Sequence, residues 1–449
     1  MHGEHGFQPQ DAETEALIAA ELNKWLEQGA ASEYQEYLTQ CPPGEKKFFP
    51  TIVRREDAEG GPLTNVVLTL VDPLRPHRTS MMALVAKKDG SKRVVNWVQD
   101  LNTHMVTKVF AHERLEDITA RLVPGAMMIV LDIKSAFNHL VLQHASRQHA
   151  GFFFRGKWYV QNVMFFGMHP APYYWTKLLR ASAVKRAREH GLVFNVFVDD
   201  MLIVIEPSYG QVKTSGTAND IDQMPIANMY KRESANNAPS PASMEECLRQ
   251  KSVMEEALTH FGFVINKEKG SGPAHEAQYL GYVIKTHPQL KEALFVIPSK
   301  KRRSAMGRLR GLIEAGIKLK EVPVRRVASV VGVLQFLCRA VRLGPLRLRA
   351  AHRLISSVLM QGGEMHVGNW SKNVVLDMAT VADLEWWLGM VKENGGKPTH
   401  QAPAEFTITT DASKAGWGGT LHQGAALDAA TTAQSTPMLQ ACSKITKKD

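Results

Sequence analysis

The sequence lacks the features that direct a chain out of the cell or into a membrane. Its four cysteines, Cys41, Cys247, Cys338 and Cys442, lie far apart without C-x-x-C spacing, which argues against a zinc module and against a secreted disulfide framework. The chain does not open with a signal peptide, and no apolar run approaches the roughly 20 residues that span a bilayer. We therefore expect a soluble intracellular protein, in the cytoplasm or the nucleus, that does not contact membranes.

Acidic residues are almost absent from one part of the chain. Residues 300–353 hold 15 lysines and arginines against two acids, a net charge of +13 in a chain whose total is +10. These basic residues alternate with Val, Leu and Ile at helical spacing, so they belong to helices that keep an apolar side. This pattern favours a surface that contacts the phosphate backbone of nucleic acid over a merely solvated face.

The hydrophobic pattern predicts short strands mixed with helices in a chain long enough for about three domains. The first half predicts helices over 12–40, strands at 66–71, 81–86 and 94–95 with a turn at 88–91, a polar helix over 110–122 and a strand at 127–131. The second half predicts a helix over 245–260, strands at 261–265 and 279–284, basic helices divided at Pro323 and Gly344-Pro345, a helix over 373–392 and a last strand at 406–410.

Residues 207–244 differ in composition from the segments on either side. They are rich in Ser, Thr, Asn, Ala and Pro and show little periodicity. Such a segment cannot bury enough apolar surface to order itself, so we expect a disordered insertion without chemistry. An artefact of the gene structure is the alternative interpretation.

Two apolar runs carry acids where buried strands normally have none. Asp199 and Asp200 divide the run from Phe194 to Ile205, which predicts a tight hairpin with both carboxylates at its tip. Asp132 ends a second apolar run, 67 residues before Asp199. Asp is also a common turn residue, so the pair alone is weak support for a site. Three carboxylates at neighbouring strand ends would repel one another without a cation, and Mg²⁺ prefers such oxygen ligands.

The sequence around these acids resembles the reverse transcriptases of retroelements. Five blocks occur in the order of that family: Leu131-Asp-Ile-Lys-Ser-Ala-Phe137, Phe165-Phe-Gly-Met-His-Pro-Ala-Pro172, Phe197-Val-Asp-Asp200, Asn266-Lys-Glu-Lys269 and Tyr279-Leu-Gly281. Upstream, Lys87-Lys-Asp-Gly-Ser-Lys-Arg93 and Leu101-Asn102 resemble the fingers segment of the same family. The likeness covers about 80–285 and continues more weakly to about 390.

The resemblance implies a catalytic centre with two Mg²⁺ ions, for which Mn²⁺ can substitute. Asp132 and Asp199 would bind both metals, and Asp200 would support the one near the primer 3′ hydroxyl. Lys269 corresponds to the lysine that protonates the departing pyrophosphate. These four residues are the predicted catalytic set.

The resemblance also implies a set of nucleotide-binding residues. Lys87 and Arg93 match the cations that hold the triphosphate, although Lys88 is an alternative to Lys87. Phe137 falls where the family places the bulky side chain that collides with a ribose 2′-hydroxyl, and its alternative is a core aromatic. Phe166 and Gly167 match the pair at which the backbone approaches nucleotide and template.

Three positions depart from the family pattern. Phe165 stands where many relatives carry Pro, and Trp97 and Gln99 stand where Asp and Arg are usual. None of these changes removes an expected metal ligand.

The last segment resembles the first hairpin of a retroelement RNase H domain. Its sequence Thr409-Thr-Asp-Ala-Ser-Lys-Ala-Gly-Trp-Gly-Gly-Thr-Leu421 is similar to that of DIRS-class retrotransposons and some pararetroviruses, with Asp411 as the first metal-binding acid. Only 38 residues follow Asp411, and they lack the further carboxylates such a domain needs. We expect no RNase H activity. We also expect the chain to be either a fragment of a longer polyprotein or a decayed copy.

Together these features predict an α+β fold of the right-hand polymerase class, with fingers, a palm built on an antiparallel sheet and a helical thumb. The expected domains are an N-terminal helical extension (1–49), fingers and palm (50–290), a basic thumb and connection (291–396) and a truncated RNase H-like remnant (397–449). The expected partners are an RNA or DNA template with primer and deoxynucleotides. Two other hypotheses stay open: a decayed remnant that only binds nucleic acid, and an RNA-dependent RNA polymerase.

Overall fold

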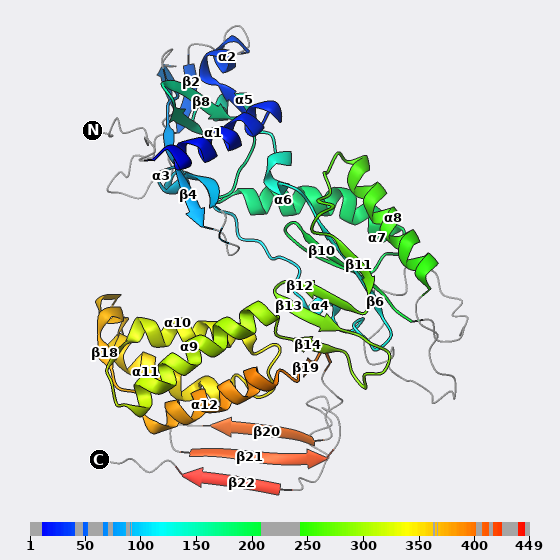
Figure 1. Ribbon diagram of the computed structural model, residues 1–449, viewed down its shortest axis with the longest axis vertical. Helices are drawn as coiled ribbons and strands as arrows, with labels where there is room; N and C mark the ends of the chain where they lie inside the picture. Colours follow the sequence, from blue (N-terminus) through cyan, green and yellow to red (C-terminus); the bar gives the residue numbers. More distant parts are fainter. Residues whose placement is uncertain are drawn as a thin grey trace. The chain divides into compact units, whose positions relative to one another are not determined.

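The computed structural model describes most of the 449-residue chain. The described residues are 11–40, 48–52, 66–70, 75–86, 90, 92–207, 243–361, 364–365, 367–400, 406–412, 416–423 and 439–444. They form two compact units (Figure 1). The first unit comprises residues 1–117, 127–205 and 242–274, and the second comprises 118–126, 206–241 and 275–449.

One sheet of the first unit has five strands, in the order β1-β8-β7-β4-β5. These strands are β1 (Ala31–Glu33), β8 (Lys157–Gln161), β7 (Gly151–Phe154), β4 (Thr79–Ala86) and β5 (Lys92–Trp97). Helix α1 (Ala12–Glu27) begins at Asp11, whose side chain accepts a hydrogen bond from the Thr14 amide, and ends before Gly29, which has a positive φ. Its residues Ile18 and Leu22 share a buried cluster with Phe152 of β7, so α1 is anchored on this sheet.

A second sheet of the first unit is antiparallel throughout and has the order β11-β6-β10-β9. Its strands are β11 (Ser271–Ala274), β6 (Met127–Asp132), β10 (Asp200–Ile205) and β9 (Phe194–Phe197). Every residue of β6 is buried, as expected for a central strand whose first five residues are all apolar. The predicted strand at 127–131 and the predicted hairpin at 194–205 are therefore confirmed.

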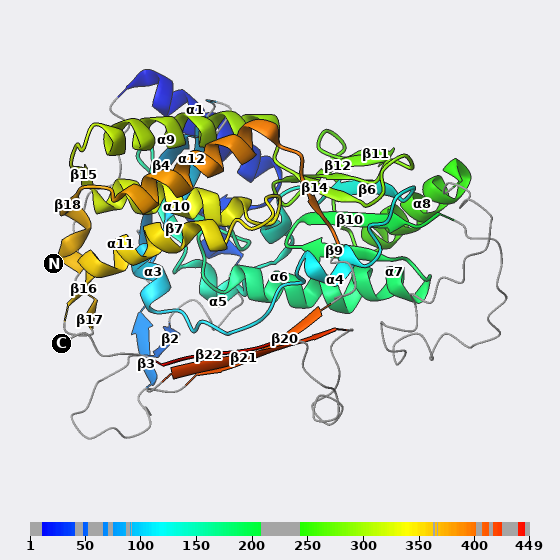
Figure 2. The same ribbon diagram turned by 90° about the horizontal axis from the view of Figure 1, so that it is seen from below.

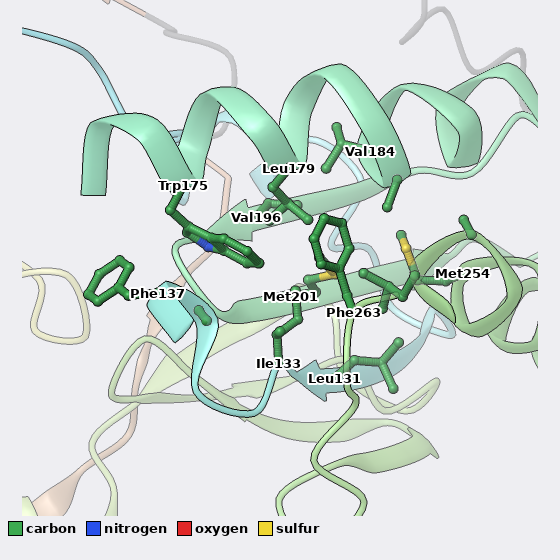
Figure 3. Close-up of a cluster of buried hydrophobic side chains, with 14 of the residues drawn as sticks. Leu131, Ile133, Phe137, Trp175, Leu179, Val184, Val196, Met201, Met254 and Phe263 are labelled. Atoms are coloured by element: carbon green, nitrogen blue, oxygen red, sulfur yellow. The ribbon is translucent and has the colours of Figure 1, made fainter. Parts of the chain in front are cut away.

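The core of the first unit lies between this second sheet and a layer of helices (Figure 3). Alternate residues such as Leu131 of β6 and Met201 of β10 point into it, in keeping with the two-residue period of a strand. The helices supply Trp175, Leu179 and Met254. They are α6 (Ala171–Leu179), a π-helical turn (Arg180–Val184), α7 (Lys185–Glu189) and α8 (Met244–His260), and the first three form one continuous rod in Figure 2.

The smaller elements of the first unit connect these layers. They are α2 (Tyr34–Thr39), the hairpin of β2 (Phe48–Ile52) and β3 (Val66–Leu70), α3 (Gln99–Thr103), α4 (Glu116–Thr119), which runs into the second unit, a 3₁₀ helix (Ala136–His139) and α5 (His144–Arg147).

The second unit combines a four-stranded sheet with long helices. The sheet order is β12 (Glu276–Tyr279), β13 (Tyr282–Lys285), β14 (Leu294–Val296) and β19 (Lys397–Pro398). The helices are α9 (Ser299–Ile317), α10 (Val324–Leu337), α11 (Arg349–Leu359) and α12 (Met378–Glu393), which pack side by side in Figure 1. Helix α12 ends at Asn394, whose side-chain amide exchanges two hydrogen bonds of 3.0 Å with the backbone of Ile297.

Further short elements complete the second unit. They are the strand pairs β15 (Val322–Pro323) with β18 (Asn373–Val374) and β16 (Met360–Gln361) with β17 (Glu364–Met365), 3₁₀ helices at Leu346–Leu348 and Val367–Ser371, and a three-stranded antiparallel sheet of β20 (Phe406–Ala412), β21 (Gly416–Gln423) and β22 (Leu439–Lys444). Among the described helices of both units, none is long and apolar enough to cross a bilayer.

The structure corrects three predicted elements. The predicted polar helix over 110–122 is reduced to the four residues of α4, because Glu113 and Arg114 bind the backbone amide of Val196 and the side chain of Asn195 instead. Residues 261–265 are a turn and a loop rather than a strand, with one isolated bridge between Ile265 and Ile133 and a hydrogen bond from the Lys134 amide to the Val264 carbonyl. Residues 279–284 are the turn of a hairpin, with positive φ at Leu280 and Gly281, not one strand.

The other predicted helices and strands are present within a few residues of their expected bounds. Several elements were not predicted, among them strands β1, β2, β7, β8, β11, β14 and β22 and helices α6 and α7. Of the predicted insertion, residues 208–242 lie outside the described residues, as do Lys88, Asp89 and Ser91 of the predicted turn.

Gly272 of β11 gives a test of how closely this edge strand approaches β6. A Cβ atom at Gly272 would lie 2.2 Å from the carbonyl oxygen of Met128, and the residue has a φ of +92°. We expect Gly272→Ala to lower the free energy of unfolding by about 2–4 kcal/mol, from steric overlap added to left-handed strain. Chemical denaturation measures it.

Gly262 is the matched control for this substitution. It has a similar φ of +77°, but no atom lies within 4 Å of its Cβ position. Gly262→Ala should therefore cost only the strain, about 1 kcal/mol. Equal losses in the two variants would show that the close approach at Gly272 does not matter.

Candidate active site

The pairing of β6 with β10 decides where the three predicted acids lie. In this antiparallel register Asp132, at the end of β6, stands directly opposite Asp200, at the start of β10. Asp199 precedes Asp200 in the hairpin tip, and its carbonyl oxygen accepts a hydrogen bond of 2.9 Å from the amide of Ile133. Three carboxylates that are distant in sequence therefore lie together at one end of the sheet.

Asp132 is the most enclosed of the three acids, with 3% of its surface exposed. Its Oδ1 accepts a hydrogen bond of 2.8 Å from the side-chain amide of Asn266, and its Oδ2 lies 3.1 Å from Nζ of Lys269. The backbone amide of Asn266 also donates to the Asp132 carbonyl oxygen, at 2.7 Å. The loop before β11 thus supplies a donor to each oxygen of a buried carboxylate, which such a charge requires.

Asn266 is a site residue that the sequence analysis did not assign. It opens the block Asn266-Lys-Glu-Lys269, from which only the lysine received a role. The sequence held one signal for this role: Asn266 is a polar residue that directly follows an apolar loop and stands three positions before a lysine. Its partner could not be inferred, because the pairing depends on the path of the loop in space.

The electrostatic environment at the hairpin tip favours the protonated forms of its acids. Burial raises the pKa of the Asp199 carboxyl above its usual value. Burial, together with the negative charges of Asp199 and Asp132, raises the pKa of Asp200 to about 6. The positive charge of Lys269 therefore does not balance the negative charges of the three acids, and a bound cation would reduce the repulsion between them.

The donor chemistry of the three acids fits a hard divalent cation. Carboxylate oxygens are the ligands that Mg²⁺ prefers, and the surplus of negative charge would be reduced by binding it. Among the described residues, no group of three or more His, Cys, Asp or Glu side chains is already arranged to hold a metal ion. Each oxygen of Asp132 accepts one hydrogen bond, from Asn266 or from Lys269, and keeps a second lone pair that could bind a metal ion.

A cleft of about 700 Å³ opens over these residues within the first unit. The acids Asp132 and Asp199 line it together with Lys269, Arg93 and Phe166. Other parts of its wall come from α1, β5 and the loop after β6: Leu17, Ala20, Glu21, Lys24, Trp25, Lys92, Val94, Val95, Asn96, Ile133, Lys134, Ser135 and Asn138. Acidic and basic groups thus face one cavity, large enough for a nucleotide-sized ligand.

The predicted nucleotide-binding residues are placed in different surroundings. The guanidinium of Arg93 lies 5.3 Å from the ring centre of Phe166, which is 45% exposed. Phe137 packs against Phe166, with ring centres 4.9 Å apart, but it is 5% exposed and belongs to the core. Phe137 is not among the residues that line the cleft, so its role as a gate stays a prediction.

Gly167 occupies a position that suits glycine for two reasons. Its φ is +103°, and an added Cβ would lie 3.2 Å from a methyl group of Val98. Asn102 fixes the backbone around it by donating to the Gly167 carbonyl oxygen at 2.7 Å and accepting from the His169 amide at 2.9 Å. Asn102 therefore acts as a support for the loop, a role that the sequence analysis did not assign.

The side chains of two predicted site residues lie outside the part of the chain that the structure describes. Lys87 lies outside the described residues. Asp411 lies in β20, opposite Gly418 of β21, but its side chain is outside the description. The three departures from the family pattern leave the acids in place: Phe165 is buried, Trp97 is 57% exposed and Gln99 begins α3.

The arrangement of three acids on an antiparallel hairpin agrees with the family comparison. Residues 81–217 match the family model described as reverse transcriptase (RNA-dependent DNA polymerase). The chain contains a reverse transcriptase domain. This domain includes Asp132, Asp199 and Asp200, while Asn266 and Lys269 follow it in sequence.

Solved structures with the same fold come from foamy viral protease-reverse transcriptases. One, dRH in complex with double-stranded DNA, matches with a TM-score of 0.55 and 14% identity, over 99% of this chain and 59% of that one. Another, in complex with RNA/DNA hybrid, has a TM-score of 0.53 and 13% identity, with coverage of 99% and 45%. A third, in complex with double-stranded DNA, has a TM-score of 0.52 and 14% identity, with coverage of 99% and 70%.

These matches confirm the predicted fold class, α+β of the right-hand polymerase type. The matched residues, from β4 to β10, lie within the predicted fingers and palm segment (50–290), whose bounds stay a prediction. The chain spans 59% and 45% of the length of the first two viral proteins.

The support that Asn266 gives to Asp132 can be tested by substitution. Asn266→Ala removes the hydrogen bond to a 3% exposed carboxylate, and we expect the free energy of unfolding to fall by about 2 kcal/mol. Chemical denaturation in metal-free buffer gives the value. Lys267→Ala, at the exposed neighbouring position, is the control and should change it by less than about 0.5 kcal/mol. A loss no larger than that of the control would rule out the support.

Proposed function

We propose that this protein is an RNA-directed DNA polymerase of a retrotransposon that adds deoxynucleotides to a primer 3′ end on an RNA or DNA template. The observation that carries the proposal is the β6–β10 register, which sets Asp132 opposite Asp200 and beside Asp199 within the reverse transcriptase domain. The fold shared with viral proteins solved with nucleic acid supports the same proposal.

In this proposal the three acids form the metal-binding centre. Asp132, Asp199 and Asp200 would hold two Mg²⁺ ions, or Mn²⁺ in their place, which supply Lewis-acid activation of the attacking hydroxyl and stabilisation of the leaving oxygen. The main-chain bond from Ile133 to the Asp199 carbonyl and the Asn266 bond to Asp132 would fix the carboxylates. Preorganised ligands of this kind need not reorganise during the reaction.

The cations of the cleft have separate proposed roles. Arg93, on β5 and next to the Phe166 ring, would bind the triphosphate and stabilise charge that develops on it. Lys269 would give a proton to the departing pyrophosphate. Its ammonium group contacts Asp132, and 63% of its side chain is exposed, so it can turn from the carboxylate toward the cleft.

The second unit would supply the nucleic-acid grip. The basic residues of α9, α10 and α11 would contact phosphates of template and primer without reading their sequence. The hairpin of β20 and β21 with Asp411 is proposed as an RNase H-like remnant without activity.

Primer extension tests the proposed activity. We expect the wild-type chain to extend oligo(dT) on poly(rA) with dTTP and Mg²⁺ or Mn²⁺, and Asp199→Asn to lose activity about a hundredfold or more. Glu189→Gln removes an equal charge from an exposed position of α7 and should leave extension unchanged. Silence of the wild type with intact primer-template binding would instead support the decayed remnant, and extension with ribonucleotides would support an RNA polymerase.

Phe137 distinguishes a sugar gate from a core aromatic. If it excludes the ribose 2′-hydroxyl, Phe137→Ala should raise ribonucleotide incorporation relative to deoxynucleotide incorporation about tenfold or more. If it only fills the core, the variant should lose about 3–5 kcal/mol of stability with an unchanged ratio. Paired measurements of the kcat/KM ratio and of unfolding decide between them.

A further inference from the structure

The hairpin tip that carries two of the acids contains an unfavourable backbone conformation. Val198, directly before Asp199, has a φ of +57°. Left-handed backbone is rare for residues other than glycine and is a genuine outlier for a β-branched side chain. Such conformations persist only where the surrounding structure enforces them, so some contact must hold this turn.

The contact that holds the turn comes from helix α6. The indole nitrogen of Trp175 donates a hydrogen bond of 2.8 Å to the carbonyl oxygen of Val198. That carbonyl belongs to the peptide joining Val198 to Asp199, so its direction sets the orientation of the Asp199 backbone. The next carbonyl, that of Asp199, accepts from the Ile133 amide at 2.9 Å. Two successive peptides are thus fixed from two different elements.

Trp175 is itself fixed in position. It is completely buried, and its ring lies against Phe263 (centres 5.3 Å apart) and His139 (5.6 Å apart) (Figure 3 shows Trp175 and Phe263). The His139 ring accepts a hydrogen bond from the Val264 amide through Nε2 and contacts the Ala136 carbonyl through Nδ1. These contacts join α6 to the segments after Asp132 and before Asn266.

The valine side chain has its own partner. Val198 is half-buried and packs against the core cluster that includes Trp175. Glycine would adopt the left-handed conformation freely but would lose this packing. The sequence therefore keeps an apolar side chain at the tip, and the indole bond holds the backbone conformation that this side chain disfavours.

We propose that Trp175 is a positioning residue that holds Val198 in its left-handed conformation, and so aims Asp199 into the cleft and keeps Asp200 opposite Asp132. The proposal rests on the proposed polymerase function, whose acids it positions. Trp175 lies on α6, whereas the acids lie on β10 and in the turn before it, so it acts through the backbone and does not contact substrate.

The kinetic test uses Trp175→Phe, which keeps an aromatic ring and removes the indole donor. We expect kcat for primer extension to fall about tenfold, as for one lost hydrogen bond in the transition state, while KM for dTTP changes less than about twofold. Val198→Gly adopts the left-handed turn without help, so adding Trp175→Phe to it should lower kcat less than about twofold. A tenfold loss in both backgrounds would mean that Trp175 acts by packing alone and would overturn the proposal.

A second test does not depend on activity. Hydrogen exchange in the peptide covering 194–205 should be faster in Trp175→Phe than in the wild type. When Trp175→Phe is added to Val198→Gly, exchange in this peptide should not become faster than in Val198→Gly alone. Trp387→Phe is the matched control, because Trp387 is equally buried and donates to the Arg347 carbonyl at 3.1 Å in the second unit. It should alter exchange near Arg347 and leave 194–205 unchanged.

The two tests separate the two proposals. A silent wild-type enzyme whose hairpin exchanges faster in Trp175→Phe would refute the polymerase function and support the backbone contact. An active enzyme in which Trp175→Phe changes neither kcat nor exchange at 194–205 would refute the positioning role and leave the polymerase function intact.

Discussion

The antiparallel pairing of β6 with β10 is the interaction on which the candidate site depends. Because side chains alternate along a strand, a shift of one residue in this register would separate Asp132 from Asp200 and exchange the residues of β10 that face this core, such as Met201, for those that face away from it. Core packing and site geometry are therefore fixed by the same hydrogen bonds. This explains how acids can persist in an apolar run: the strands are held by their hydrophobic residues, and the acids occupy the ends.

Electrostatic repulsion at this end of the sheet is offset only in part. Asn266 and Lys269 compensate Asp132, whereas Asp199 and Asp200 keep raised pKa values. The polypeptide thus provides one well-satisfied carboxylate and two that would gain from a cation.

Much of this arrangement could be predicted from the sequence, because local patterns determine it. The apolar runs ending in Asp132 and flanking Asp199 predicted the strands, and the ordered blocks predicted the fold. Contacts that depend on the path of a loop or on the reach of one side chain could not be predicted. The loop at 261–265 resembles a strand in composition, yet it pairs with the residues just after β6 through a single isolated bridge, between Ile265 and Ile133. Likewise, the aromatic pattern of α6 does not reveal that Trp175 reaches the Val198 carbonyl.

The division of the chain into two interleaved units has a consequence for its synthesis. Residues 118–126 belong to the second unit, although they precede most of the reverse transcriptase domain. The Leu122 carbonyl accepts a hydrogen bond from Thr399, 277 residues later, and Thr286 binds the Ala126 carbonyl. During translation, residues 118–126 therefore lack these hydrogen-bond partners until Thr286 and Thr399 have been synthesised. The emerging first unit must therefore fold while residues 118–126 still lack the partners that are translated later.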